Sequence, residues 1–142
     1  GNSLEAITCE RSDFVYPKPV KLIQKIVRLA SPKNGTILDF FAGSGTTAHA
    51  IINQNNADGG KRHFILITNN ENGICENVTQ NRIRQVMSGY EDCLKKEFIA
   101  GPGGTFHYVT DLKSIDTSSQ IMITPKSPSP VQSNSANIFA EP

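Results

Sequence analysis

The segment at residues 36–50, TILDFFAGSGTTAHA, constrains this chain more than any other part of its sequence. An apolar run ends in Asp39, passes through a Gly-x-Gly turn at Gly43 and Gly45, and enters a stretch rich in Ala and Ile. Glycines have no Cβ, so the backbone turns tightly and ligand atoms can approach the main chain. A helix that begins near Thr46 offers unpaired N–H groups and the positive end of its dipole. The pattern predicts a strand, a loop and a helix that together hold a nucleotide-like ligand.

The glycine spacing alone leaves several interpretations open. Residues 43–48, GSGTTA, fit the dinucleotide pattern G-x-G-x-x-G/A, which by itself is weak. They do not form a Walker A loop, because no Lys follows the second glycine and the four-residue gap between glycines is missing. A glycine-rich turn without a ligand remains an alternative. A nicotinamide dinucleotide oxidoreductase is a further one, although Phe41 has no role in such a site.

Length, charge and cysteine content limit the class of protein. The 142 residues suffice for one domain, and the net charge of +1 gives no whole-chain signal for nucleic acid. The three cysteines are odd in number and form no C-x-x-C pair, so we expect neither a disulfide framework nor a zinc site, and a reducing cytoplasm fits best. No apolar run approaches the ~20 residues of a membrane span. Because the chain opens with Gly, we expect a fragment, a processed product or an expression boundary.

Hydrophobic periodicity and turn residues predict an α/β arrangement. We expect the first helix to present a wide apolar arc and to pack against the sheet. We expect the consecutive apolar residues of the second strand to lie in a sheet covered on both faces. The expected elements are a helix to residue 30, a strand at 36–40, a helix at 46–54, a polar loop at 53–60, a strand at 63–68, a helix at 77–88, a turn at 101–104, a strand at 105–110 and a possible edge strand at 121–123.

Composition divides the chain into three parts. Residues 1–15 form a mixed N-terminal flank, residues 16–112 form the folded portion, and residues 113–142 are rich in Ser, Pro and Asn. The last part has few large apolar residues to offset chain entropy, so we expect a mostly disordered tail. The basic residues gather on two predicted helices, where they form either a solvated face or a phosphate-contacting one: Lys18, Lys21, Lys25 and Arg28 on the first, Arg82 and Arg84 on the second.

The order of several segments resembles one family. A YPKP segment at residues 16–19 precedes DFFAGSGTT at 39–47, and RHFILITNNEN at 62–72 follows, with ICENVT at 74–79 and RIR at 82–84. This order resembles the amino-methylating, adenine-specific DNA methyltransferases of the β class, and most closely the C-terminal part of the modification subunit of type III restriction systems. The resemblance covers residues 14–112. Phe40 is a departure, since the family has Pro there.

The resemblance implies a cofactor, a fold and a set of site residues. The cofactor is S-adenosyl-L-methionine, and the fold is a three-layer, Rossmann-like α/β unit with a mainly parallel sheet, here incomplete. Thr46 and Thr47 are expected to cap the following helix, alone or while also reaching the cofactor carboxylate. Glu71, with Asn69 as a helper, is either the ribose acceptor or a solvated loop residue. The full set implied for the cofactor is Lys18, Pro19, Asp39, Phe41, Ala42, Gly43, Ser44, Gly45, Thr46, Thr47 and Glu71.

A catalytic loop that the family has is absent from this chain, and its absence determines the expected activity. The family holds its flipped-out base with an Asp/Asn-Pro-Pro-Tyr loop, and this sequence contains no Pro-Pro dipeptide. No catalytic residue is therefore assigned, and we expect the chain alone to be inactive. The expected partners are DNA, through a recognition region outside this chain, and either a restriction subunit or the N-terminal part of the same enzyme. A non-catalytic remnant or a complementing module is the alternative.

Overall fold

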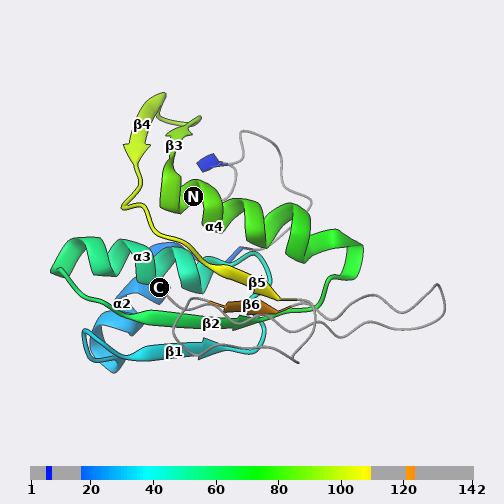
Figure 1. Cartoon of the computed structure of the whole chain (residues 1–142). Helices are drawn as coiled ribbons and strands as arrows, with labels where there is room; N and C mark the ends of the chain where they lie inside the picture. The colour runs from blue at the N-terminus through cyan, green and yellow to red at the C-terminus, as the bar shows by residue number, and fades with distance from the viewer. Residues whose placement is uncertain (1–5, 8–16, 110–120, 124–142) are drawn as a thin grey trace.

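A parallel sheet of four strands organises the molecule. The computed structural model describes residues 6–7, 17–109 and 121–123. The strands lie in the order β1-β2-β6-β5 (Figure 1). They comprise β1 (Thr36–Asp39), β2 (His63–Ile67), β5 (His107–Val109) and β6 (Ile121–Ile123). The predicted α/β class with a parallel sheet is confirmed.

The first crossover unit matches the prediction from the glycine loop. Helix α3 (Thr46–Asp58) connects β1 to β2, and the two strands pair in parallel with Thr36 opposite His63 and Asp39 opposite Leu66. Parallel neighbours need such a crossover, because a tight hairpin can join only antiparallel strands. The core lies between α3, β2 and α4 (Gln80–Ser88), where Ile51, Phe64 and Ile83 are almost completely buried. The glycine loop is thereby anchored to the best-packed part of the chain.

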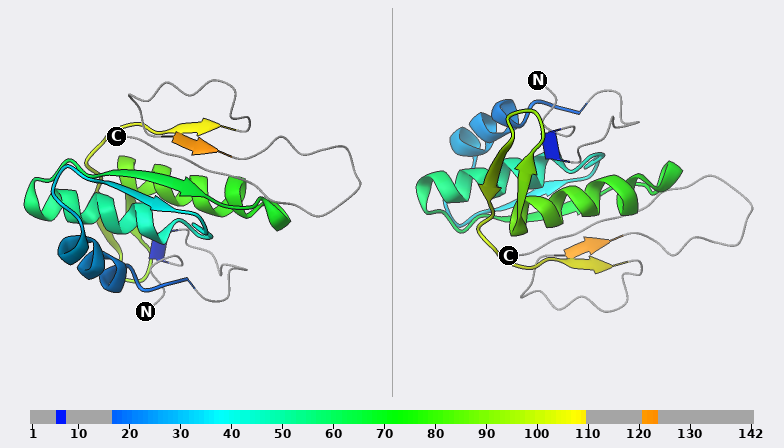
Figure 2. Two further views of the ribbon diagram at one scale, coloured as in Figure 1. Left: turned by 90° about the horizontal axis from the view of Figure 1, so that it is seen from below. Right: turned by 90° about the horizontal axis from the view of Figure 1, so that it is seen from above.

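Helix α2 (Val20–Ala30) does not pack where we expected it. It lies alongside α3 rather than on the sheet (Figure 2). Val20 and Val27 are buried there. The second apolar row of the expected arc remains largely exposed, and it consists of Leu22, Ile26 and Leu29.

Two element boundaries and the position of one strand differ from the prediction, and side-chain hydrogen bonds explain the two boundaries. Helix α3 continues through the expected polar loop to Asp58, because its polar side chains make tertiary contacts: Asn55 donates to the carbonyl of Arg62 at 2.9 Å. The helix expected from residue 77 instead begins with a π-helical segment (Ile74–Thr79), and the Asn70 side chain accepts the N–H of Cys75 at 3.1 Å. The third difference is β6, which was expected at an edge and lies between β2 and β5.

A second, two-stranded sheet was not predicted. Strands β3 (Gly89–Asp92) and β4 (Glu97–Ala100) form an antiparallel hairpin that projects beyond α4, away from the main sheet (Figure 1). Its turn has no glycine. The Asp92 carboxylate accepts the N–H groups of Leu94 and Lys95, both at 3.0 Å, and Lys96 adopts a φ of 56°. The side chain of an acid thus replaces the glycine that a sequence pattern would require.

Other expectations meet the structure only in part. We expected no disulfide framework, and Cys93 is nevertheless disulfide-bonded, whereas Cys75 is a free, buried thiol. Residues 1–5 and 8–16 of the expected N-terminal flank lie outside the described residues. The expected disordered tail also lies outside them, except for the three residues of β6.

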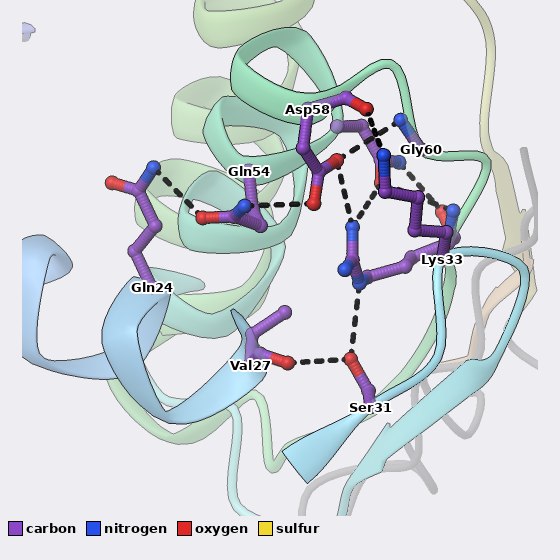
Figure 3. Close-up of polar contacts among 9 residues, drawn as sticks. Gln24, Val27, Ser31, Lys33, Gln54, Asp58 and Gly60 are labelled. Carbon is purple, nitrogen blue, oxygen red and sulfur yellow. Dashed lines mark hydrogen bonds and ion pairs between the residues drawn. The ribbon is translucent and has the colours of Figure 1, made fainter. Parts of the chain in front are cut away.

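A polar cluster fastens α2, α3 and the start of β2 at the end of the sheet opposite the glycine loop. The Arg62 side chain is 2% exposed, and its guanidinium donates to Asp58 Oδ1 and to Ser31 Oγ, both at 3.0 Å. Figure 3 shows Ser31, Gln54 and Asp58 converging from the two helices. The hydrogen bonds from Arg62 and Gln54 keep the pKa of the Asp58 carboxyl well below its usual value of 3.8, so the ion pair persists through the physiological range.

Replacing Ser31 measures how much this cluster contributes. The Ser31 hydroxyl donates to the carbonyl of Val27 at 2.7 Å while it accepts from Arg62. We expect Ser31→Ala to lower the free energy of unfolding by about 1 to 2 kcal/mol, because a buried guanidinium loses an acceptor. Urea unfolding followed by circular dichroism provides the measurement.

Ser88→Ala is the matched control. Ser88 makes the same type of bond, to the carbonyl of Arg84 at 2.9 Å, but it is exposed and bonds no buried cation. Its loss should cost less than about 0.5 kcal/mol. Equal costs for the two variants would show that the Arg62 contact adds nothing.

Candidate cofactor site

A tight loop joins β1 to α3 and contains both glycines. Gly43 and Gly45 have φ values of 49° and 76°, in the left-handed region that favours glycine. The N–H of Ala42 donates to the carbonyl of Ile67 at 3.0 Å, and the N–H of Gly43 donates to the Thr68 hydroxyl at 3.2 Å. These bonds hold the loop at the carboxyl end of β2, where open parallel sheets bind ligands.

The Asp39 carboxylate closes the loop from its two ends. Oδ1 accepts the N–H of Phe41 at 3.0 Å, and Oδ2 accepts the Thr47 hydroxyl at 2.5 Å. The expectation that Thr46 and Thr47 cap α3 is wrong, because Gly45 is the N-cap residue and no side chain makes a capping bond. The Thr47 hydroxyl therefore orders the acid at the end of β1 rather than the helix end.

Arg82 supports the loop from inside the protein. Its side chain is fully buried, and Nη1 lies 3.2 Å from the carbonyl oxygen of Ser44, 3.0 Å from Ser44 Oγ and 3.0 Å from Thr46 Oγ1. Nε and Nη2 lie 3.4 and 3.3 Å from Nδ1 of His49, one turn further along α3. One guanidinium group thus connects the end of the loop with the first two turns of the helix.

The charge state of this buried group is set by its surroundings. Burial lowers the pKa of Arg82 only to about 10, so the guanidinium remains charged at neutral pH. Burial, and secondarily the Arg82 charge, lower the pKa of His49 from 6.5 to about 3. His49 is therefore neutral, and its Nδ1 lone pair faces Arg82. The Tyr90 ring meets the imidazole edge to face, with a centroid separation of 6.5 Å and an interplanar angle of 84°.

The remaining loop residues divide into an outward and an inward group. The Phe41 side chain is 92% exposed, whereas Ala42, Ser44 and Thr46 are buried. The hydroxyls of Ser44 and Thr46 lie 3.3 Å apart, beside Arg82. Only the main chain of these two residues is left to meet a ligand.

Thr79 fixes the glycines from the π-helical segment. Its hydroxyl donates to the carbonyl oxygens of Gly43 and Ile74. A Cβ added to Gly45 would lie 3.1 Å from the Thr79 methyl group and 3.7 Å from Ile83. The close contact explains why the second loop position must be glycine for packing as well as for backbone conformation.

The other predicted site residues are not joined to the loop. Glu71 is exposed in the short helix η1 (Glu71–Gly73), where its carboxylate accepts from Asn69 at 3.2 Å. Pro19 is the N-cap residue of α2, and Lys18 beside it is exposed. Among the described residues, no hydrogen bond or ion pair connects either Lys18 or Glu71 to the loop.

Sequence reasoning missed the residues that support the loop. Arg82 was considered only as part of a solvated or phosphate-contacting face, and it belongs to neither. The sequence spacing does place Arg82 on the same helix face as Thr79, Ile83 and Val86. The structure shows that all of these residues are buried. An arginine inside an otherwise inward-facing row is a candidate for a structural or site role.

No group of three or more His, Cys, Asp and Glu side chains is placed to hold a metal ion among the residues that the structure describes. Within the same part of the chain, no helix combines the length and the apolar character needed to cross a bilayer.

Comparisons with known proteins agree with the resemblance drawn from the motifs. Residues 3–80 match the N6_N4_Mtase family model, described as DNA methylase. The StyLTI Mod subunit, a type III restriction-modification enzyme of Salmonella typhimurium, is 48% identical over a 77-residue alignment that covers 51% of this chain and 12% of that protein. The EcoPI Mod subunit of Escherichia phage P1 is 50% identical over 41% of this chain and 9% of its own length.

A relative outside the type III systems matches as well. The type II methyltransferase M.KpnI of Klebsiella pneumoniae is 47% identical over 40% of this chain and 14% of its own length. The chain thus spans only a small part of each relative. The family model covers more than half of the chain, and the glycine loop lies inside the matched residues. The chain therefore belongs to the N6_N4_Mtase family of DNA methylases and resembles part of a type III Mod subunit.

Proposed function

We propose that residues 16–112 form the S-adenosyl-L-methionine-binding portion of an adenine-specific DNA methyltransferase. The observation that supports this most is the loop between β1 and α3, in a chain of the DNA methylase family. When bound, this cofactor would supply an electrophilic methyl group for the exocyclic amine of adenine. This chain's own contribution is to bind and orient the cofactor, since proximity and orientation lower the barrier without a covalent enzyme intermediate.

The residues present suit the amino-acid end of this cofactor. Helix α3 presents its first-turn N–H groups at the loop, and none of the described hydrogen bonds outside the helix is donated by the N–H of Ser44, Thr46 or Thr47. Such groups, together with the helix dipole, favour a carboxylate. Because the Ser44 and Thr46 hydroxyls bond Arg82, we assign them main-chain contacts only.

The other assignments follow the family resemblance. Asp39 orders the loop and faces the amino-acid end, the exposed Phe41 ring forms one wall, and Ala42, Gly43 and Gly45 let the cofactor approach the backbone. Thr47 acts through Asp39. Glu71 accepts the ribose hydroxyls, and Lys18 with Pro19 closes the site near the carboxylate. The complete sheet of the intact enzyme would be a three-layer, Rossmann-like unit.

Calorimetric titration of the chain tests this proposal. We expect saturable, one-to-one binding of S-adenosyl-L-homocysteine, and a gain of about 2.7 kcal/mol in the free energy of unfolding at a ligand concentration 100 times the dissociation constant. NAD is the matched control, and it should not compete. No binding to a chain that circular dichroism shows to be folded would remove the proposal.

A complementing module is the second candidate, and one observation favours it. The 142 residues contain no Pro-Pro dipeptide, so the family's base-holding loop must come from elsewhere. The substrate is then DNA, the location is the cytoplasm, and the partners are the N-terminal part of the enzyme and a restriction subunit. We expect no methylation by this chain alone and restored methylation after mixing with a part that carries the Asp/Asn-Pro-Pro-Tyr loop. Methylation by the isolated chain would refute this assignment.

A further inference from the structure

The buried guanidinium of Arg82 does more than fill space beneath the loop. All of its described acceptors belong to the turn and to the first two turns of α3: the Ser44 carbonyl, two hydroxyls and one imidazole nitrogen. These acceptors lie on two sides of a planar fork, and only a guanidinium presents donors in that arrangement. The conformation of residues 44–46 therefore depends on Arg82 directly.

The charge of Arg82 lies where it reinforces the end of the helix. Its Nη1 is 3.2 Å from the carbonyl of Ser44, immediately before the first turn of α3. A full positive charge there adds to the partial positive charge that the helix dipole places at its N-terminus. Because Arg82 is fully buried, water screens this charge poorly, and its potential extends to the exposed side of the loop.

We propose that Arg82 is a positioning residue that makes the loop selective for the carboxylate of the cofactor. The proposal rests on the proposed function, since it assumes that the amino-acid end of S-adenosyl-L-methionine lies at the loop. Arg82 acts in two ways: its fork holds the main chain of residues 44–46 in place, and its charge attracts the carboxylate through that main chain.

A structural role alone predicts a different result. If Arg82 only stabilises the fold, its removal weakens every ligand of the site by the same factor. If it also acts on the carboxylate, the loss is larger for a ligand that has this group. A thermodynamic cycle separates the two roles. One change is made in the protein and the other in the ligand, and the coupling between the two changes is measured.

The experiment compares S-adenosyl-L-methionine with decarboxylated S-adenosylmethionine, which lacks only the carboxylate. Both are titrated calorimetrically into the full 142-residue chain and into its Arg82→Met variant. We expect the wild-type chain to prefer the carboxylate-bearing ligand and Arg82→Met to reduce this preference about tenfold. Arg82→Lys, which keeps the charge and loses the fork, should give an intermediate preference.

Arg84→Met is the matched control from the same helix. Arg84 is exposed, with its guanidinium carbon 6.0 Å from the centroid of the Phe106 ring, so water screens its charge and its removal should change the preference less than about twofold. Circular dichroism at the titration temperature establishes that each variant is folded. Arg82→Lys decides the matter by the same comparison if Arg82→Met does not fold.

The outcomes distinguish this proposal from the one on which it depends. A wild-type chain that binds neither ligand removes the proposed function itself. A wild-type chain that binds both ligands, with an unchanged preference in the Arg82 variants, leaves the proposed function standing and overturns the role of Arg82. If neither Arg82 variant folds, the residue is purely structural and this proposal is wrong.

Discussion

Acidification from pH 6.5 to pH 4 should destabilise this protein by about 3 kcal/mol through His49 alone. The pKa of His49 is 6.5 in the unfolded chain and about 3 in the folded one, because burial and the neighbouring Arg82 disfavour the imidazolium. Between these values the unfolded chain binds one more proton than the folded chain. The contribution of His49 to the free energy of unfolding is thus fully present above pH 6.5. It falls by about 1.4 kcal/mol for each pH unit below that value, until the folded-state pKa is reached.

Other shifted groups lie outside this window. The pKa of Asp58 is lowered in the folded chain, so the stability that its carboxylate contributes is lost only as the pH falls below the unfolded value of 3.8. Burial raises the pKa of the Cys75 thiol to about 12, so this thiol stays protonated throughout the window. Urea unfolding at half-unit pH intervals, followed by circular dichroism because the chain has no Trp, gives the slope.

His49→Asn identifies the group responsible. The amide oxygen of Asn can replace Nδ1 as the acceptor for Arg82, and it does not titrate. The variant should lose most of the acid slope, whatever its stability at pH 7. His49→Gln should also flatten the slope, since it removes the same titrating group. A slope that survives in both variants would assign the acid sensitivity to other residues.

The parts of the fold that local chemistry determines were predictable. A turn at Gly43 and Gly45 needs left-handed backbone, and the consecutive apolar residues at 64–67 predict a strand. The sequence therefore indicated β1, the loop, the start of α3 and β2 correctly. The expected cover on both faces of β2 is wrong, because Phe64 and Leu66 are buried and the residues that alternate with them are only partly buried. The prediction also failed where a boundary depends on hydrogen bonds made by polar side chains beyond the element itself. The end of α3 is an example, since it depends on bonds between Asn55 and Arg62.

The sequence predicted the position of the loop at the candidate site. It did not predict the side chains that hold this loop in place. The motif placed the loop between β1 and α3, and that arrangement is observed. The roles of individual side chains differ because each is decided by a contact from far along the chain. Arg82 lies 38 residues from Ser44, and its hydrogen bonds turn the Ser44 hydroxyl inward. No local pattern around Ser44 contains that information.

Gly45→Ala should lower both the free energy of unfolding and the affinity for the proposed cofactor. Gly59→Ala should lower only the free energy of unfolding. Both glycines have left-handed φ values, 76° and 63°, at opposite ends of α3. An L-residue in this conformation costs about 1 kcal/mol. A Cβ on Gly59 would have no atom within 4 Å, whereas one on Gly45 would lie 3.1 Å from the Thr79 methyl group.

The contact with Thr79 makes the difference between the two positions. Thr79 cannot turn its methyl group away without breaking the bonds from its hydroxyl to Gly43 and Ile74, so the loop must move. We expect Gly59→Ala to cost about 1 kcal/mol and Gly45→Ala about 3 kcal/mol. Urea unfolding measures both costs. Titration with S-adenosyl-L-homocysteine should show at least about a tenfold loss of affinity for Gly45→Ala alone.

A second substitution separates backbone strain from crowding. Thr79→Ser removes the methyl group that an alanine at position 45 would crowd and keeps the hydroxyl that bonds Gly43 and Ile74. In the Gly45→Ala background it should restore most of the lost affinity and bring the stability cost near that of Gly59→Ala. If Thr79→Ser restores nothing, the left-handed backbone alone accounts for the effect, and packing against Thr79 does not shape the loop. If it restores affinity, the loop between β1 and α3 takes its form from the helix beneath it as much as from its own glycines.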